Sequence, residues 1–350
     1  MNITGTETTT PTGTTTPATD FSYSVEQSKF DPYEQLHIQL NSDGESVTRL
    51  LNLPPANDNP DPDSGQAVLS KDIILNPQKK TTLRIFVSSK LTLKNTDGSR
   101  LPIIFYFHDA AWVQSGAKHF QVHMRNSYLS CSVPAIMLLV DYRLAPENRL
   151  PAQYEDAIDA FLWLKKQALD PKGEPWVKEY GDFSRCFLFG NGCGGNVVFN
   201  AALRAMDLDL TPIKIEGLVL NQPIFGGQTR MESELNYATD NILPLPALDL
   251  MWELALPKGM DRDHRFCNPL TLDAPHNATK LKALQRCLVI AFGMNPMFDR
   301  QQEFVKMLVK HGVEVQAQFD EIGFHRIELV DPRRAVAIDN LVKEFMNKTS

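Results

Sequence analysis

Short apolar segments alternate with longer amphipathic segments over most of the chain. Near-continuous apolar runs are typical of strands buried on both faces of a sheet. We expect such strands at Ile103–Phe107, Ala135–Val140, Cys186–Phe189, Gly217–Leu220, Cys287–Phe292 and Val313–Phe319. Segments with helical spacing of apolar residues separate them, at Tyr154–Gln167, Gly195–Met206, Arg300–His311 and Pro332–Met346. This alternation predicts a mostly parallel sheet sandwiched between helices.

The N-terminal part of the chain has a different pattern. Shorter strands are expected at His37–Leu40, Thr48–Leu51, Lys71–Leu75 and Thr82–Ser88. Ten threonines among the first twenty residues leave too little apolar surface for a core, so residues 1–30 are predicted to be a disordered tail. Residues 31–350 then form a single domain. A helix within Leu243–Gly259 interrupts the alternation, and we expect cap elements around residues 31–60 and 228–265.

Charge and cysteine content narrow the class of protein. A net charge of −7 provides no basic excess for binding nucleic-acid phosphates. No apolar run is long enough to span a membrane, and the N-terminus does not resemble a secretory signal. The five cysteines form no C-x-x-C pair, which indicates reduced thiols and no zinc site. We therefore expect a cytoplasmic protein that could also enter the nucleus, a monomer or homodimer without metal, cofactor, nucleic-acid or membrane partner.

One turn between a predicted strand and a predicted helix is rich in glycine. It reads Gly190-Asn191-Gly192-Cys193-Gly194, and a nucleophile elbow of the pattern G-x-S-x-G stands in this context. The middle position here is Gly192, which has no hydroxyl. A dinucleotide fingerprint is the alternative. It normally follows the first strand and needs an acidic residue about 20 positions later, so this alternative is weak.

Motifs outside this turn indicate a family. The chain contains DYRLAPE at residues 141–147, LPAQYEDA at 150–157, NQPIFGG at 221–227 and GFH at 323–325. With these motifs in this order, the chain resembles the plant carboxylesterases. They belong to the hormone-sensitive-lipase-like group of α/β-hydrolases, which also contains the gibberellin receptors. The resemblance runs from about Asp31 to Met346 and implies an α/β-hydrolase fold with a lid.

The resemblance also implies a degenerate catalytic triad. The family's nucleophilic serine falls at Gly192, its aspartate at Asn295 and its histidine at His325. The three glycines of the oxyanion motif, which would follow His108, are replaced by Asp109, Ala110 and Ala111.

Each replacement has a physical consequence. Without a hydroxyl at position 192, no acyl-enzyme forms by the usual route. Loss of the triad carboxylate costs about 10⁴ in rate in a serine protease. If Asp109 points into the oxyanion hole, its charge repels an oxyanion and favours a developing cation. Backbone N–H groups remain as donors, namely those of Ala110, Ala111 and Cys193.

These observations leave three functions open. The first is a non-hydrolytic enzyme that cyclises, eliminates or isomerises a small plant metabolite, with His325 and Asp109 as catalytic residues. The second is a small-molecule binding protein of the gibberellin-receptor type. The third is a weak carboxylesterase that uses water or the Cys193 thiol. The ligand is a small molecule that could be cationic, and three aromatic residues are expected to line its pocket, namely Trp112, Phe225 and Trp252.

Overall fold

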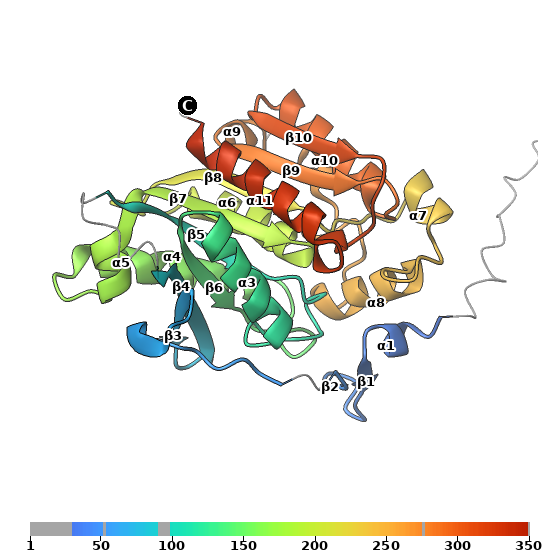
Figure 1. Ribbon diagram of the computed structural model, residues 1–350. Helices are drawn as coiled ribbons and strands as arrows, with labels where there is room; N and C mark the ends of the chain where they lie inside the picture. Colours follow the sequence, from blue (N-terminus) through green and yellow to red (C-terminus); the bar gives the residue numbers. More distant parts are fainter. Residues whose placement is uncertain (1–29, 52–53, 90–98, 275–276, 349–350) are drawn as a thin grey trace, which may run out of the picture.

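An eight-stranded sheet runs through the molecule (Figure 1). The computed structural model describes residues 30–51, 54–89, 99–274 and 277–348. The strand order is β10-β9-β8-β7-β5-β6-β4-β3. The strands span β3 Val68–Asn76, β4 Thr81–Ser88, β5 Leu101–Phe107, β6 Ile136–Asp141, β7 Gly181–Asn191, β8 Ile215–Asn221, β9 Arg286–Phe292 and β10 Val315–Asp320. Strands β3 and β4 are antiparallel to their neighbours and the other pairs are parallel, so the predicted sheet is confirmed.

Helices cover both faces of this sheet. The longer helices are α3 Phe120–Ser132, α4 Ala152–Leu169, α6 Cys193–Ala205, α8 Leu245–Ala255, α10 Phe298–Lys310 and α11 Pro332–Asn347. Strand β5 shows how the two layers arise from the sequence. Ile103, Phe105 and Phe107 pack into the core under α4 and α6, whereas Ile104 and Tyr106 pack into the core under α3 and α11. Successive side chains of a strand point to opposite faces, so a continuous apolar run serves both layers.

Shorter elements lie on several sides of the molecule (Figure 1). They are α1 Pro32–Gln35, β1 Ile38–Leu40, β2 Val47–Arg49, η2 Pro62–Ser64, α5 Pro175–Tyr180, α7 Glu232–Asn236, η3 Pro269–Leu272, α9 Ala278–Lys282 and η5 Ile327–Leu329. The two segments that were expected to form a cap meet in space (Figure 1). Helix α1 contacts α8, and the Gln35 side-chain amide donates a hydrogen bond of 2.9 Å to the carbonyl of Asn241. The predicted N-terminal tail falls almost entirely outside the described residues.

The structure departs from the predicted elements in two places. Strand β10 is half exposed, because it lies at the edge of the sheet and pairs only with β9; it is thus an exception to the burial on both faces that was expected for most of these strands. Helix α3 was not predicted. Its buried side carries Arg125, Asn126 and Ser130, and these polar residues hide the apolar periodicity that marks a buried helix face.

Two further observations concern the helices and the cysteines. No helix in the described part of the chain combines the length and the apolar character that a membrane span requires. All five cysteines are free thiols, and only Cys131 is exposed.

Candidate functional site

The glycine-rich turn joins β7 to α6 in a strained conformation. Gly192 lies between Asn191, the last residue of the strand, and Cys193, the first residue of the helix. Its backbone has φ 53° and ψ −119°, a combination that side chains disfavour and that glycine adopts readily. A Cβ at Gly190 would lie 2.1 Å from the carbonyl oxygen of Gly194, which explains why that position also carries no side chain. The turn therefore keeps the backbone of a nucleophile elbow.

The carboxylate of Asp109 fills the space that a side chain at position 192 would need. A Cβ built on Gly192 would lie 2.4 Å from Cγ of Asp109, and 2.5 and 2.6 Å from its two carboxylate oxygens. Real Cβ atoms do not approach other atoms so closely. Asp109 therefore occupies the space of a side chain at position 192.

One oxygen of this carboxylate faces two of the backbone donors that were expected from the sequence. The backbone N–H groups of Ala111 and Cys193 both donate to Oδ1 of Asp109, at long distances of 3.4 Å. Ala111 has φ 50°, so the loop keeps a conformation that suits glycine although the glycine is gone. The N–H of Ala110 points elsewhere and donates to Sγ of Cys193 at 3.3 Å. Of the three predicted donors, two face this carboxylate.

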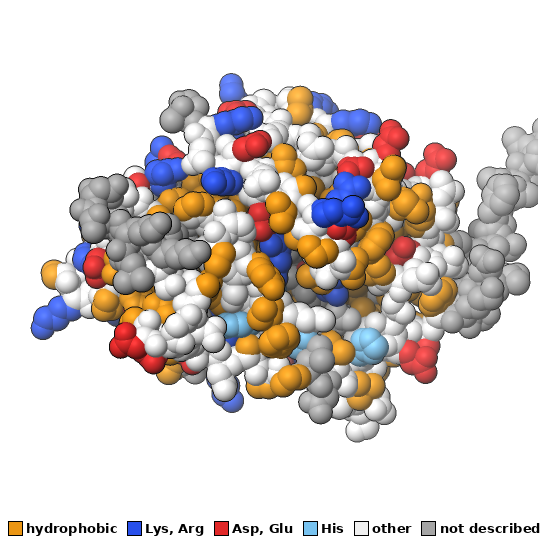
Figure 2. All heavy atoms as spheres, viewed as in Figure 1, with side chains coloured by type: hydrophobic (Ala, Val, Ile, Leu, Met, Phe, Trp, Pro, Cys, Tyr) orange, Lys and Arg blue, Asp and Glu red, His pale blue; other side chains and the backbone are white. Residues whose placement is uncertain are grey.

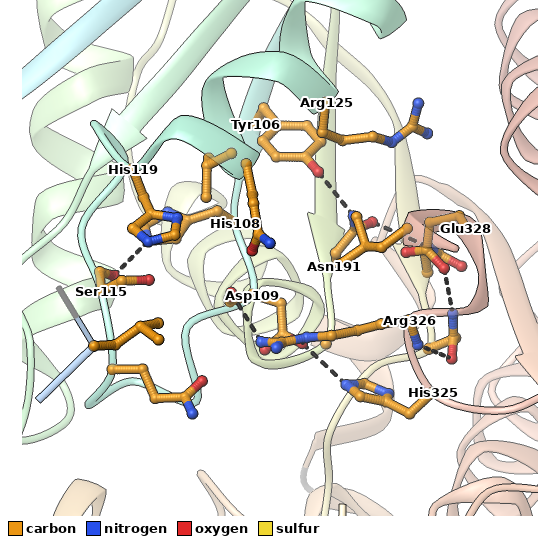
Figure 3. A pocket seen from close by; sticks show the side chains of 18 residues that line it. Tyr106, His108, Asp109, Ser115, His119, Arg125, Asn191, His325, Arg326 and Glu328 are labelled. Atoms are coloured by element: carbon orange, nitrogen blue, oxygen red, sulfur yellow. Dashed lines mark hydrogen bonds and ion pairs between the residues drawn. The ribbon is translucent and has the colours of Figure 1, made fainter. Parts of the chain in front are cut away.

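The other oxygen of Asp109 binds two basic side chains (Figure 3). His325 Nε2 donates to Oδ2 at 2.9 Å, and Arg326 Nε donates to the same oxygen at 2.7 Å. Burial alone would raise the pKa of the Asp109 carboxyl. The charge of Arg326 and the hydrogen bond from His325 outweigh this effect and hold that pKa well below its ordinary value. Asp109 is therefore ionised at neutral pH.

Arg326 changes the predicted electrostatics of the site. Arg326 pairs with Asp109 and balances its charge, so the carboxylate does not present the free negative charge that would favour a developing cation. Arg326 has φ 63°, and its Nη2 also donates to the carbonyl of Asp109 at 3.2 Å. Sequence reasoning did not identify Arg326, although a basic residue directly after the family histidine was a visible signal.

Asn295 does not substitute for the triad aspartate. Its Oδ1 accepts a hydrogen bond from the N–H of Met297 at 2.9 Å, and its Nδ2 donates to Gln222 Oε1 at 3.5 Å. His325 Nδ1 is buried and has no hydrogen-bond partner among the described residues. The carboxylate that holds the imidazole is now at Nε2. Because a carboxylate only accepts, Nε2 carries the hydrogen, and Nδ1 bears the lone pair in the neutral ring.

Two small cavities meet at Asp109, His325 and Arg326. The larger, the polar cavity, has a volume of about 80 Å³, is lined mostly by polar and charged residues, and is shown in Figure 3. Besides these three residues its lining includes Tyr106, His108, His119, Arg125, Asn191, Asn221, Gln222 and Glu328. The smaller cavity, of about 30 Å³, extends toward helices α1 and α8, whose residues form part of its lining. No group of three potential metal ligands is found within the described ranges.

Comparison with known proteins identifies the family. A family model described as an alpha/beta hydrolase fold matches residues 104–329. "Probable carboxylesterase 9" of Arabidopsis thaliana is 47% identical over 319 residues, which cover 91% of this chain and 98% of the relative. The chain belongs to the plant carboxylesterase family of α/β hydrolases.

Other similar proteins agree with this family. "3-O-acetylpapaveroxine carboxylesterase CXE2" of Papaver somniferum is 41% identical over 321 residues, covering 90% of this chain and 99% of the relative. Among solved structures, an esterase of Pyrobaculum calidifontis matches with a TM-score of 0.64 and 23% identity, covering 79% of this chain and 85% of that one. This structural match shows the α/β-hydrolase fold alone.

The aromatic residues expected in the pocket of this family member lie in its core. Trp112 and Trp252 are buried and pack on each other with ring centroids 4.5 Å apart. Phe225 packs on Phe304 at the same distance. None of the three lines either cavity beside His325, so their assignment to that pocket was wrong. Large apolar side chains give the same sequence signal in a core and in a pocket.

The Cys193 thiol is also unsuited to chemistry. Its Sγ is buried, accepts from Ala110 N–H and lies 3.6 Å from the hydroxyl of Tyr142. Burial, together with the charge of Asp109, raises the pKa of this thiol to about 12. A thiol with that pKa is almost entirely protonated at neutral pH and is a poor nucleophile.

Proposed function

We propose that this member of the plant carboxylesterase family is a non-hydrolytic enzyme, which cyclises, eliminates or isomerises a small plant metabolite by proton transfer at His325. The observation that carries the proposal is the position of Asp109. Its carboxylate stands where the nucleophile's side chain would be, and it accepts a hydrogen bond from His325. The machinery of the acyl-enzyme route is thus replaced, while the family histidine stays in contact with a carboxylate.

The contact between His325 and Asp109 supports proton transfer. A carboxylate at one ring nitrogen fixes the tautomer of the imidazole and stabilises the imidazolium that forms when the ring takes a proton. Nδ1 is the ring nitrogen without a partner, and we assign proton exchange with the substrate to it. Asp109 stays ionised through its contact with Arg326 and acts as a positioning residue for His325.

Ester hydrolysis is disfavoured by the same geometry. An ester carbonyl oxygen would need the donors at Ala111 and Cys193, which already face the Asp109 carboxylate. The space beside Gly192, where a serine hydroxyl would lie, is occupied by the Asp109 carboxylate. The Cys193 thiol is buried and protonated, so it does not supply a nucleophile in its place. A weak carboxylesterase is therefore the least favoured of the three functions.

A binding protein without turnover is the second candidate. The observation that favours it is the saturation of Asp109, whose two oxygens already contact His325, Arg326 and the backbone donors. A ligand would then fill the cavities without any bond being made or broken.

The experiment compares wild type with His325→Ala on metabolite extracts of the plant tissue that expresses the gene. Products are detected by mass spectrometry. We expect wild type to form products of unchanged mass, or products that have lost water or a carboxylic acid, and His325→Ala to form none. Folding of the variant is checked by its unfolding curve. Equal product formation by both proteins refutes the role of His325. Enrichment of a compound on the wild-type protein without product favours the binding protein.

A further inference from the structure

A groove between α3 and α11 adjoins the polar cavity beside Asp109. It has a volume of about 630 Å³ and is lined by residues of α3, η5 and α11. Four residues line both the groove and the polar cavity: Gln121, Arg125, Glu328 and Leu329. The two spaces are therefore adjacent, and these residues lie between them.

The outer part of the groove is apolar and exposed. Four of its lining side chains are large, hydrophobic and about half exposed or more, namely Phe120, Tyr128, Leu329 and Val336. Figure 2 shows hydrophobic side chains on the face that α3 and α11 form, next to a hollow. Exposed apolar side chains that gather around a concave surface are typical of a binding site.

A buried ion pair holds the two helices at the groove. Arg125 of α3 binds Asp339 of α11 through two hydrogen bonds, of 2.5 and 3.2 Å, and Ser132 donates to the same carboxylate at 2.7 Å. Both charged side chains are more than nine-tenths buried. The groove therefore has a fixed floor, which suits a preformed binding site.

The inner part of the site contains polar atoms without partners. Five buried side-chain atoms of cavity-lining residues have no hydrogen-bond partner in the described structure: His108 Nδ1, His119 Nε2, Arg125 Nε, Asn221 Oδ1 and His325 Nδ1. Most are acceptors. His108 Nε2 lies 3.0 Å from the carbonyl of Ser115 and so carries its hydrogen, which leaves Nδ1 to accept. Buried polar atoms without partners are unfavourable unless a ligand or water binds them.

The volumes of the polar cavity and of the groove indicate which part of a ligand each could hold. The polar cavity of about 80 Å³ has room for two or three waters, at about 30 Å³ each, or for one small polar group. The groove falls within the range of about 300–1,000 Å³ that small-molecule sites occupy. We propose that a mainly apolar, hydroxylated ring compound binds with its rings in the groove and its hydroxyl group in the polar cavity. The inference rests on the proposed function, because it names the substrate class of the same site.

Binding is tested with 2-naphthol as the probe and 2-methoxynaphthalene as its matched partner, which cannot donate a hydrogen bond. Affinity is measured by calorimetry. Occupancy of the groove is read from Cys131, an exposed thiol that lines it, as slower reaction with a disulfide reagent. We expect 2-naphthol to bind at least tenfold more tightly than the methyl ether and to slow the reaction of Cys131. Equal affinities, absence of binding, or an unprotected Cys131 would overturn the proposal.

A pair of variants locates the probe. Val336→Arg places a charge in the groove, and we expect it to weaken 2-naphthol binding at least tenfold. Ile74→Arg is the control, because Ile74 is also exposed but lies on the outer strand β3. Unchanged binding to Val336→Arg overturns the proposal. A change in molecular mass measured by light scattering, with no change in binding, would instead assign the groove to self-association and also overturn it.

These outcomes are separable from those of the proposed function. Probe binding requires no turnover, so it can succeed while wild type and His325→Ala give the same products. Conversely, a substrate found in plant extracts whose KM is unaffected by Val336→Arg leaves the function intact and overturns the groove.

Discussion

Placing a serine at position 192 should destabilise this protein. A Gly192→Ser side chain would place its Cβ 2.4 Å from Cγ of Asp109. Either the turn shifts, or the Asp109 carboxylate leaves its contacts with His325 and Arg326. Forcing an extra group into a packed site costs about 1–3 kcal/mol, and a side chain at positive φ adds roughly 1–2 kcal/mol. We expect Gly192→Ser to lower the free energy of unfolding by about 3 kcal/mol.

A second glycine separates the clash from the backbone cost. Gly259 has φ 79°, and a Cβ built on it has nothing within 4 Å. Gly259→Ser should therefore cost only the roughly 1–2 kcal/mol of the backbone. The measurement is equilibrium unfolding in urea, followed by the fluorescence of the buried Trp112 and Trp252.

Removing the carboxylate should relieve the clash. Adding Asp109→Gly to Gly192→Ser clears the space around position 192, although it leaves Arg326 without its partner. The arginine side chain is 32% exposed and can turn toward solvent, which limits that loss. We expect Gly192→Ser to cost less in the Asp109→Gly background than in wild type, by about 1–3 kcal/mol of coupling. If Gly192→Ser costs no more than Gly259→Ser, or if the two substitutions are additive, the reasoning is refuted.

Three further predictions concern activity, pH and packing. Wild type and Gly192→Ser/Asn295→Asp should show no hydrolysis of nitrophenyl acetate, whereas adding Asp109→Gly to that pair should produce measurable hydrolysis; turnover by the pair alone would contradict the blocked oxyanion hole. Because the folded-state pKa of Asp109 is lowered, its stabilisation is complete above the unfolded value near 4 and is lost as the pH falls through the folded value. Wild type should thus lose more stability than Asp109→Asn between pH 5 and the acid limit of folding, and parallel unfolding curves would refute this. Arg125→Met should destabilise by about 3–5 kcal/mol because it leaves Asp339 buried and unpaired, and Arg125→Met/Asp339→Leu should recover most of that loss in the same urea assay.

Sequence patterns were sufficient for the sheet and for the turn at Gly192. An apolar run such as Ile103–Phe107 is a local property, and so is a glycine between a strand and a helix. Helix α3 could not be predicted from the sequence pattern, because its buried polar residues bind partners in elements far along the chain, as Arg125 does with Asp339. Such pairing depends on the tertiary structure and leaves no periodic signal.

The electrostatics of the site could not be predicted for a related reason. The charge of Asp109 was visible in the sequence, but its neutralisation depends on where Arg326 points. That direction follows from a backbone at φ 63°, which a non-glycine residue adopts only in a supporting structure. Likewise, the stacking of Trp112 on Trp252 is set by the packing of the core.

The contact between Asp109 and Gly192 couples two positions that lie far apart in the sequence. In the family pattern that the chain resembles, a serine stands at position 192 and a glycine at position 109. In this structure a side chain at position 192 would place its Cβ 2.4 Å from Cγ of Asp109, so a serine at 192 and this carboxylate exclude each other. A substitution at either position therefore changes which residues the other can accept, and among relatives a small residue at one position should accompany a larger residue at the other.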